Sequence, residues 1–398
     1  MSRLFWVPSG LRFLFDWANS DELRKELKSR RAVKQAVQAC RGVTGDLYLD
    51  ILPETAKFDE TYVETSVERG EIAFCATVAT GPGASAPELN LRATVEGCGT
   101  RKVFEGAAKR GADGVYRFVA PWADAKRWDI HTPGNLYTCR LETDGDAALP
   151  FRFGFREIRQ VGHDWLLNGT PVHLRSLYNG ATKTHSSFSG KAACVESCRR
   201  AKEMGFNSFI AGNYNCQAGS VSYLDGLLEA CDEEGVLYAF SLPNTREFKN
   251  DLDNPVSREN YRRLTREMIR RARNHPSVVF YAMNHNNTGY TQEQNPCRMD
   301  GVKPPVPSSP SHAQARAAAE TAAKIAYAID PTRIVYHHCS GLLSGVHNTE
   351  CYLNWAPVQE RSDWMELWSK EGKAPHYIVE YGVPLSMSWF SYRWPSHI

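Results

Sequence analysis

The sequence lacks several features that would assign a protein to a specialised class. It contains no apolar run long enough to span a bilayer and no paired Cys-x-x-Cys ligand set. Lysine and arginine number 47 and aspartate and glutamate 45, so the formal charge is only +2. We therefore expect no membrane anchor and no nucleic-acid partner, because polyanion binding needs a clustered basic face.

The cysteines are numerous but not arranged as a framework. Eleven of them are scattered along 398 residues, an odd number with no ligand-like spacing. Free buried thiols are favoured over disulfides or a zinc site, which points to a reducing, cytoplasmic compartment. A periplasmic or secreted protein is the alternative if the natural N-terminus lies upstream of this sequence. With 42% hydrophobic and 23% charged residues, the composition is that of an ordinary globular protein.

Three regions follow one another along the chain. Residues 1–45 read as a charged helical segment, with Ser20 as N-cap. Residues 46–158 contain short runs in which polar and apolar residues alternate, separated by turn-rich pieces. This pattern is typical of an immunoglobulin-like β-sandwich. The expected strands lie at 46–52, 62–67, 71–78, 89–95, 115–119 and 136–142.

In residues 159–398, short apolar runs alternate with helical stretches, which predicts a parallel sheet built from βαβ units. The expected strands are 172–176, 208–211, 237–240, 278–283, 334–337, 350–353 and 377–380. The expected helices are 191–204, 223–234, 258–273, 313–329 and 362–371. The fold class is therefore α/β, a (β/α)8 TIM barrel incomplete at strand eight, preceded by the sandwich.

Active sites of such barrels lie at the carboxyl ends of the strands. The residues there are mostly amides, aromatics and imidazoles, which suit the hydroxyl groups and apolar faces of an oligosaccharide or glycoside. The predicted substrate-binding residues are Arg175, Asn179, Asn213, Tyr214, Asn284, Asn286, Tyr290, His337, Trp355 and Tyr381.

Glu380 is the best candidate for a catalytic residue, because a carboxylate that ends a buried strand is costly unless it is used or paired. A structural ion pair, for instance with Arg175, is the alternative. His285 is a second catalytic candidate, although it also fits a polar pocket rim. We expect no metal, since His337 and His338 are neighbours and point to opposite faces of a strand.

Several segments, in the right order, resemble glycoside hydrolase family 2, the β-galactosidase and β-glucuronidase group. They are Phe-Gly-Phe-Arg at 153–156, Leu-Asn-Gly-Thr-Pro at 167–171, Cys-Asp-Glu-Glu-Gly at 231–235, Arg-Asn-His-Pro-Ser at 273–277 and Val-Glu-Tyr-Gly at 379–382. The resemblance implies retaining hydrolysis of a β-glycoside without a cofactor. Glu380 would be the nucleophile and Asn284 a contact to the sugar 2-hydroxyl.

The chain departs from the family where the proton donor should stand. The family pattern after strand four is Asn-Glu, whereas this chain has Asn284 followed by His285. Two hypotheses follow. The first is a divergent glycosidase in which His285 or a loop carboxylate, Glu293 or Asp300, replaces the acid/base. The second is a non-catalytic carbohydrate-binding relative or an inactive fragment. The resemblance also makes residues 1–45 a remnant of a jelly-roll domain and the chain a truncated member. A homo-oligomer is compatible with the sequence.

Overall fold

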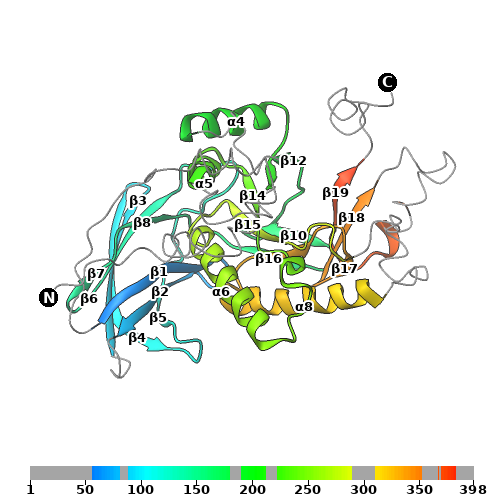
Figure 1. Ribbon diagram of the computed structural model, residues 1–398. Coiled ribbons are helices and arrows are strands. Elements are labelled where there is room, and N and C mark those ends of the chain that lie inside the picture. Colours follow the sequence, from blue (N-terminus) through cyan, green and yellow to red (C-terminus); the bar gives the residue numbers. More distant parts are fainter. Residues whose placement is uncertain are drawn as a thin grey trace. The chain divides into compact units, whose positions relative to one another are not determined.

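The computed structural model describes residues 56–80, 88–179, 190–211, 222–288, 310–351, 366 and 369–381 (Figure 1). The chain divides into two compact units. The first unit comprises Met1–Glu157, Leu177–Tyr238 and Arg266–Val278, and the second comprises Ile158–Ser176, Ala239–Thr265 and Val279–Ile398. The predicted helical segment at 1–45 and the predicted strand at 46–52 lie outside the described residues.

Eight strands of the first unit form one antiparallel sheet in the order β1-β2-β5-β4-β3-β6-β7, with β8 paired to β6. The bounds are β1 Ala56–Ser66, β2 Glu71–Thr80, β3 Leu89–Gly97, β4 Thr100–Arg110, β5 Tyr116–Pro121, β6 Tyr137–Thr143, β7 Asp146–Ala147 and β8 Phe151–Phe153. These strands confirm the expected alternation over 62–142, and they add β4, which the sequence did not predict.

The pairing changes within β4, which pairs with β3 from Thr100 to Ala108 and with β5 at Lys109 and Arg110. Alternate residues of the strands meet in a single core that includes Phe74, Trp122 and Tyr137. The rings of Trp122 and Tyr137 lie 4.8 Å apart in an edge-to-face arrangement, a favoured geometry for aromatic pairs. The eight-stranded sheet is therefore held together by apolar burial on its core side.

From β12 (Ser176–Asn179) to β16 (Ile334–His337), strands alternate with helices along the chain. The bounds of the remaining elements are β9 Ile158–Val161, β10 Asp164–Leu167, β11 Thr170–Pro171, α4 Lys191–Glu203, β13 Ser208–Ala211, α5 Ser222–Glu234, β14 Leu237–Ser241, η3 Thr245–Phe248, α6 Pro255–Ala272, β15 Val278–Met283, α8 Pro310–Ile329, β17 Gly341–Leu343, β18 Val346–Cys351 and β19 His376–Tyr381. Strands β12 to β16 form one sheet in chain order, and β17, β18 and β19 form another.

Several predicted bounds are confirmed and two are wrong. Strands β13, β15 and β16 occupy the predicted residues, because each is a short buried apolar run. The predicted strand at 172–176 is displaced, since β12 begins only at Ser176. The predicted strand at 350–353 is also displaced, since β18 spans Val346–Cys351. A closed eight-stranded barrel and the domain bounds 1–45, 46–158 and 159–398 stay predictions.

Helix ends and helix faces follow from the sequence. Gly235 follows α5 with a φ of 71°, a left-handed conformation that glycine adopts without strain. A Cβ atom there would lie 2.5 Å from the carbonyl oxygen of Ile130, so glycine is also required for space. Helix α8 buries a stripe of alanines at helical spacing, which lets it pack closely: Ala315, Ala318, Ala319, Ala322, Ala323 and Ala326.

A buried network of charges ties β1 of the first unit to the segment that follows α6. The guanidinium of Arg273 donates to Glu60 at 2.8 Å and lies 3.6 Å from the centre of the Tyr62 ring. Asn274 accepts from the backbone of Val63 at 3.3 Å and donates to the carbonyl of Thr61. The Arg-Asn of the segment at 273–277 therefore has structural partners.

Asp232 at the end of α5 is the second centre of this network. One carboxylate oxygen accepts from the backbone and hydroxyl of Ser277 at 3.1 and 2.6 Å, and the other lies 2.6 Å from His275. Arg156 donates to the carbonyls of Pro276 and Val278 at 3.0 and 2.6 Å. Each buried charge thus has hydrogen-bond partners, as buried charges require.

The described residues bear on two further expectations. No helix among them has both the length and the apolarity to cross a membrane. Seven cysteines in this part of the chain are free thiols and six of them are buried, which confirms the expectation of free thiols for these positions.

Candidate active site

Glu380 lies near the end of β19, which pairs in parallel with β18 in the second unit (Figure 1). The register of this pair shifts between Thr349 and Glu350, so that Glu350 lies opposite Glu380 rather than opposite Val379. A bulge of this kind redirects side chains at the end of a strand. Here it brings two carboxylates together on neighbouring strands.

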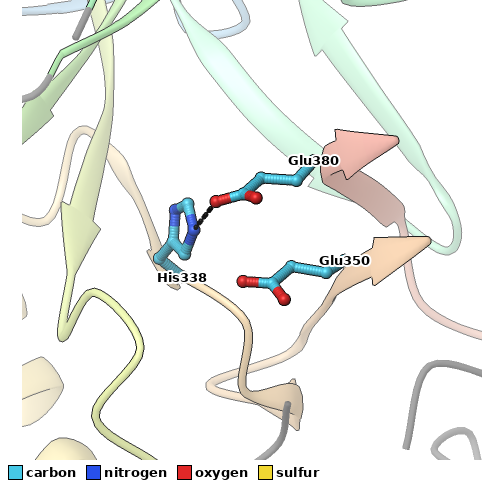
Figure 2. Close-up of side chains that lie close together, drawn as sticks. All are labelled: His338, Glu350 and Glu380. Carbon is cyan, nitrogen blue, oxygen red and sulfur yellow. Dashed lines mark ion pairs between the residues drawn. The ribbon is translucent and has the colours of Figure 1, made fainter. Parts of the chain in front are cut away.

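His338 completes a cluster with these two carboxylates, and the three side chains face one another in Figure 2. Its Nε2 atom lies 3.6 Å from Oε1 of Glu380. One nitrogen of His338 and one oxygen of each carboxylate all lie within 4.8 Å of one another. We call these three residues, His338, Glu350 and Glu380, the strand-end cluster.

Burial differs within the strand-end cluster. The side chains of His338 and Glu380 are 1% and 40% exposed, and Glu350 is 5% exposed. The Glu350 carboxylate and burial both raise the pKa of the neighbouring Cys339 thiol, with burial the larger cause. Cys339 therefore stays a neutral thiol at neutral pH and is no nucleophile here. Glu380 is the member of the cluster that solvent or a ligand reaches most readily.

The turn after β16 holds His338 in place. The backbone N–H of His338 donates to the carbonyl of Met283, the last residue of β15, at 2.8 Å. The imidazole ring lies 4.1 Å from that of His285, centre to centre. His338 therefore contacts both catalytic candidates, Glu380 and His285.

Asn284 fixes the loop that carries His285. It adopts a left-handed conformation with a φ of 54°, which asparagine tolerates better than most residues. Its side-chain oxygen accepts from the backbone and the hydroxyl of Thr245, both at 2.9 Å. Asn287 donates to the same hydroxyl and to Asn250 at 2.8 and 2.7 Å. This polar network positions the loop before any ligand binds.

His337 belongs to the same network. It lies 3.1 Å from the amide of Asn284 and 3.0 Å from the hydroxyl of Ser344. Complete burial lowers the pKa of His337 to about 3, with the Arg316 charge as a smaller cause, so the ring is neutral. His337, the last residue of β16, and His338, in the turn that follows, contact different groups.

Aromatic rings pack beneath the strand ends in the second unit. The ring of Tyr377 in β19 lies 5.5 Å from Trp165 and 5.1 Å from Tyr336. Its hydroxyl lies 2.7 Å from that of Ser176. These contacts of Tyr377 fix the position of β19, and with it that of Glu380, relative to the neighbouring segments of this unit.

The other predicted substrate-binding residues have varied positions. Asn284 and His337 are fully buried and bonded within the loop network, whereas Asn286 and Arg175 are exposed. Asn179 and Tyr381 lie in β12 and β19, where only the backbone is described. Four predicted residues lie outside the described residues: Asn213, Tyr214, Tyr290 and Trp355.

His338 and Glu350 were not predicted as site residues. Glu350 was assigned to the start of a strand, but β18 begins at Val346, so Glu350 lies near its carboxyl end, the functional end. His337, and not His338, was predicted as a site residue. The residue at which β16 ends cannot be determined from the sequence alone. The polar run of histidines after 334–336 was the only available signal for His338.

Comparisons with known proteins find similarity to β-glucuronidases. It is 25% identical over 247 residues to a putative β-glucuronidase of Formosa agariphila, which covers 61% of this chain and 29% of that protein. It is 27% identical over 183 residues to a β-glucuronidase of Streptococcus agalactiae, covering 40% and 28%. No family model matches. The chain thus spans less than a third of the length of these curated relatives.

Solved structures of related enzymes share the fold. A β-glucuronidase of Bifidobacterium dentium complexed with coumarin-3-O-glucuronide aligns with a TM-score of 0.60 and 19% identity, covering 83% of this chain and 54% of that one. A GH2 β-galacturonidase of Eisenbergiella tayi aligns with a TM-score of 0.56 and 20% identity, covering 83% and 57%. At this identity the likeness concerns the fold.

Proposed function

Because the chain is a divergent relative of the glycoside hydrolase family 2 β-glucuronidases and β-galactosidases, we propose that it hydrolyses β-linked glycosides with Glu380 as the nucleophile. The observation that carries the proposal is the position of Glu380: a half-exposed carboxylate at the end of a parallel strand, held between His338 and Glu350. The fold we propose for this half of the chain is the TIM barrel, whose strand ends carry chemistry.

The reaction would proceed in two displacements with retention of configuration. A carboxylate oxygen of Glu380 attacks the anomeric carbon, and the bond from that carbon to the leaving oxygen breaks. The imidazolium of His285 gives its proton to the leaving oxygen. A water then attacks the anomeric carbon of the glycosyl ester, loses its proton to the neutral His285, and frees the carboxylate.

His285 supports this role through its place in the loop after β15. It is half-buried, and the loop is held by the Asn284 and Asn287 hydrogen bonds described above. An imidazole titrates near neutral pH, so it can both donate and accept a proton under the same conditions. The ring of His338 contacts both groups, since it lies 4.1 Å from the His285 ring, centre to centre, and its Nε2 atom lies 3.6 Å from Glu380.

The direct test is turnover of p-nitrophenyl β-glucuronide and p-nitrophenyl β-galactoside by the full chain. We expect release of p-nitrophenol from at least one of them, and a loss of at least about a thousand-fold in kcat/KM for Glu380→Gln. Glu366→Gln is the matched control, because Glu366 is an exposed glutamate paired with Lys370 on the surface. Circular dichroism of both variants checks that the fold is intact.

The leaving group tests the role of His285. His285→Ala should reduce turnover of an alkyl glycoside about a hundred-fold or more, because the alkoxide needs a proton. The same variant should lose much less on the p-nitrophenyl substrate, whose leaving group departs unprotonated. Equal losses on both substrates would remove His285 from the proton-transfer role. Binding of sugar without any turnover would instead favour a non-catalytic carbohydrate-binding protein.

A further inference from the structure

The strand-end cluster has the composition of a metal site as well as that of a catalytic group. Its three side chains come from the end of β16, from β18 and from β19, and each offers one ligand atom. These atoms lie within 4.8 Å of one another, and the His338–Glu380 pair is at 3.6 Å. Three ligands on three different segments can surround an ion rather than line one side of it.

The distances suit a small ion. Around a tetrahedral zinc ion with bonds of about 2.0 Å, neighbouring ligand atoms lie roughly 3.3 Å apart. The 3.6 Å separation of His338 Nε2 and Glu380 Oε1 is close to that value, and rotation of the two glutamate side chains would close the remaining gaps. The backbone positions of Glu350 and Glu380, opposite each other in the register, need no change.

Charge also favours a cation at this point. Two carboxylates lie side by side on neighbouring strands, one of them 5% exposed, and like charges in this setting repel strongly. A divalent cation neutralises both at once.

We propose that His338, Glu350 and Glu380 form a binding site for a divalent transition-metal ion, Zn²⁺ in the first place. One imidazole nitrogen and two carboxylate oxygens suit zinc, while Mg²⁺ and Ca²⁺ prefer oxygen ligands alone. Three protein ligands leave a fourth position open. This differs from the expectation of no metal, which considered only the adjacent pair His337 and His338.

The site has a consequence for the proposed hydrolysis, and this part alone rests on the proposed function. Glu380 cannot coordinate an ion and attack an anomeric carbon with the same oxygen. Zn²⁺ should therefore inhibit turnover, and a chelator should restore it. The ion would act as a reversible block of the nucleophile.

Zinc titration of the full, metal-free chain by calorimetry tests the site directly, without reference to activity. We expect one Zn²⁺ per chain with a Kd of about 1 μM or tighter. Glu350→Gln and His338→Gln should each weaken binding by at least ten-fold, and Glu366→Gln should leave it unchanged. Mg²⁺ at the same concentrations should give no measurable heat. Thermal unfolding confirms that each variant is folded.

The outcomes separate this proposal from the proposed function. No zinc binding, or equal binding by wild type, Glu350→Gln and His338→Gln, overturns the metal site, whatever the turnover. Zinc binding that is lost in these two variants, in a chain that cleaves neither glycoside, supports the metal site and counts against the proposed function alone.

Discussion

Two buried glutamates of this protein have nearly the same exposure and opposite surroundings. Glu60 in β1 is 8% exposed and Glu350 in β18 is 5% exposed. Glu60 lies 2.8 Å from Arg273, with Arg266 and Arg270 at 3.8 and 4.0 Å. Glu350 lies beside another carboxylate. Glu60 thus has positive charges as its neighbours, whereas Glu350 has a second carboxylate opposite it on β19.

Most segments that resemble glycoside hydrolase family 2 differ in the same way from the segment at 379–382, which contains the candidate nucleophile Glu380. The segments at 153–156 and 231–235 both bond to the segment at 273–277 in the first unit, since Arg156 donates to the carbonyl of Pro276 and Asp232 accepts from Ser277. Arg273 of that third segment donates to Glu60 in β1. These segments stabilise the fold. A likeness carried by these residues is therefore strong evidence for the fold and weaker evidence for the activity.

The largest effect is expected from breaking the Glu60 pair. Arg273→Met leaves a buried carboxylate without its closest partner and should lower the free energy of unfolding by about 3 kcal/mol. Arg92→Met is the matched control. Arg92 pairs with Glu105 at 3.0 Å on the surface, where both side chains are more than half exposed, and its loss should cost about 0.5 kcal/mol or less. Urea unfolding measures both, and equal losses would refute the contrast.

An intermediate effect is expected from close packing in the first unit. A Cβ atom at Gly154 would lie 2.7 Å from the Cβ atoms of Pro276 and Trp128. Gly154→Ala should therefore destabilise the protein by about 1–3 kcal/mol. Gly134→Ala, where the added atom meets nothing within 4 Å, should change the unfolding free energy by less than about 0.5 kcal/mol. A tolerated alanine at 154 would mean that the contact relaxes without cost.

The smallest effect is expected from Glu350→Gln, and here the sign of the change in stability is the test. Glu350→Gln removes one of two adjacent carboxylates, so the metal-free protein should keep its stability or gain up to about 1 kcal/mol. Glu60→Gln, the same substitution at the same degree of burial, should lose about 2 kcal/mol because the buried Arg273 loses its charged partner. Thermal unfolding in the presence of a chelator compares the two. A clear loss from Glu350→Gln would mean that its charge is already balanced within the fold.

Much of the fold could be predicted from the sequence, because buried strands such as β13, β15 and β16 are continuous apolar runs bounded by turns. Strand β4 could not, since its residues are only half-buried and its apolar residues too sparse to reveal the strand. Glu380 and His285 could be predicted as site residues, because each comes at or just after the end of a predicted buried strand. The approach of Glu350 to Glu380 depends on a register shift between β18 and β19, which is a property of the pairing and of neither strand alone.

The central claim is that Glu380 is the residue that acts on a glycoside. It is tested most directly by reacting the chain with a 2-deoxy-2-fluoro-β-glucuronyl fluoride, and its galactosyl counterpart, and locating the adduct by peptide mass spectrometry. We expect one covalent glycosyl group per chain, on the peptide that contains Glu380, and none on Glu380→Gln. An adduct on Glu350 or on another carboxylate, or turnover without any adduct, would contradict the assignment.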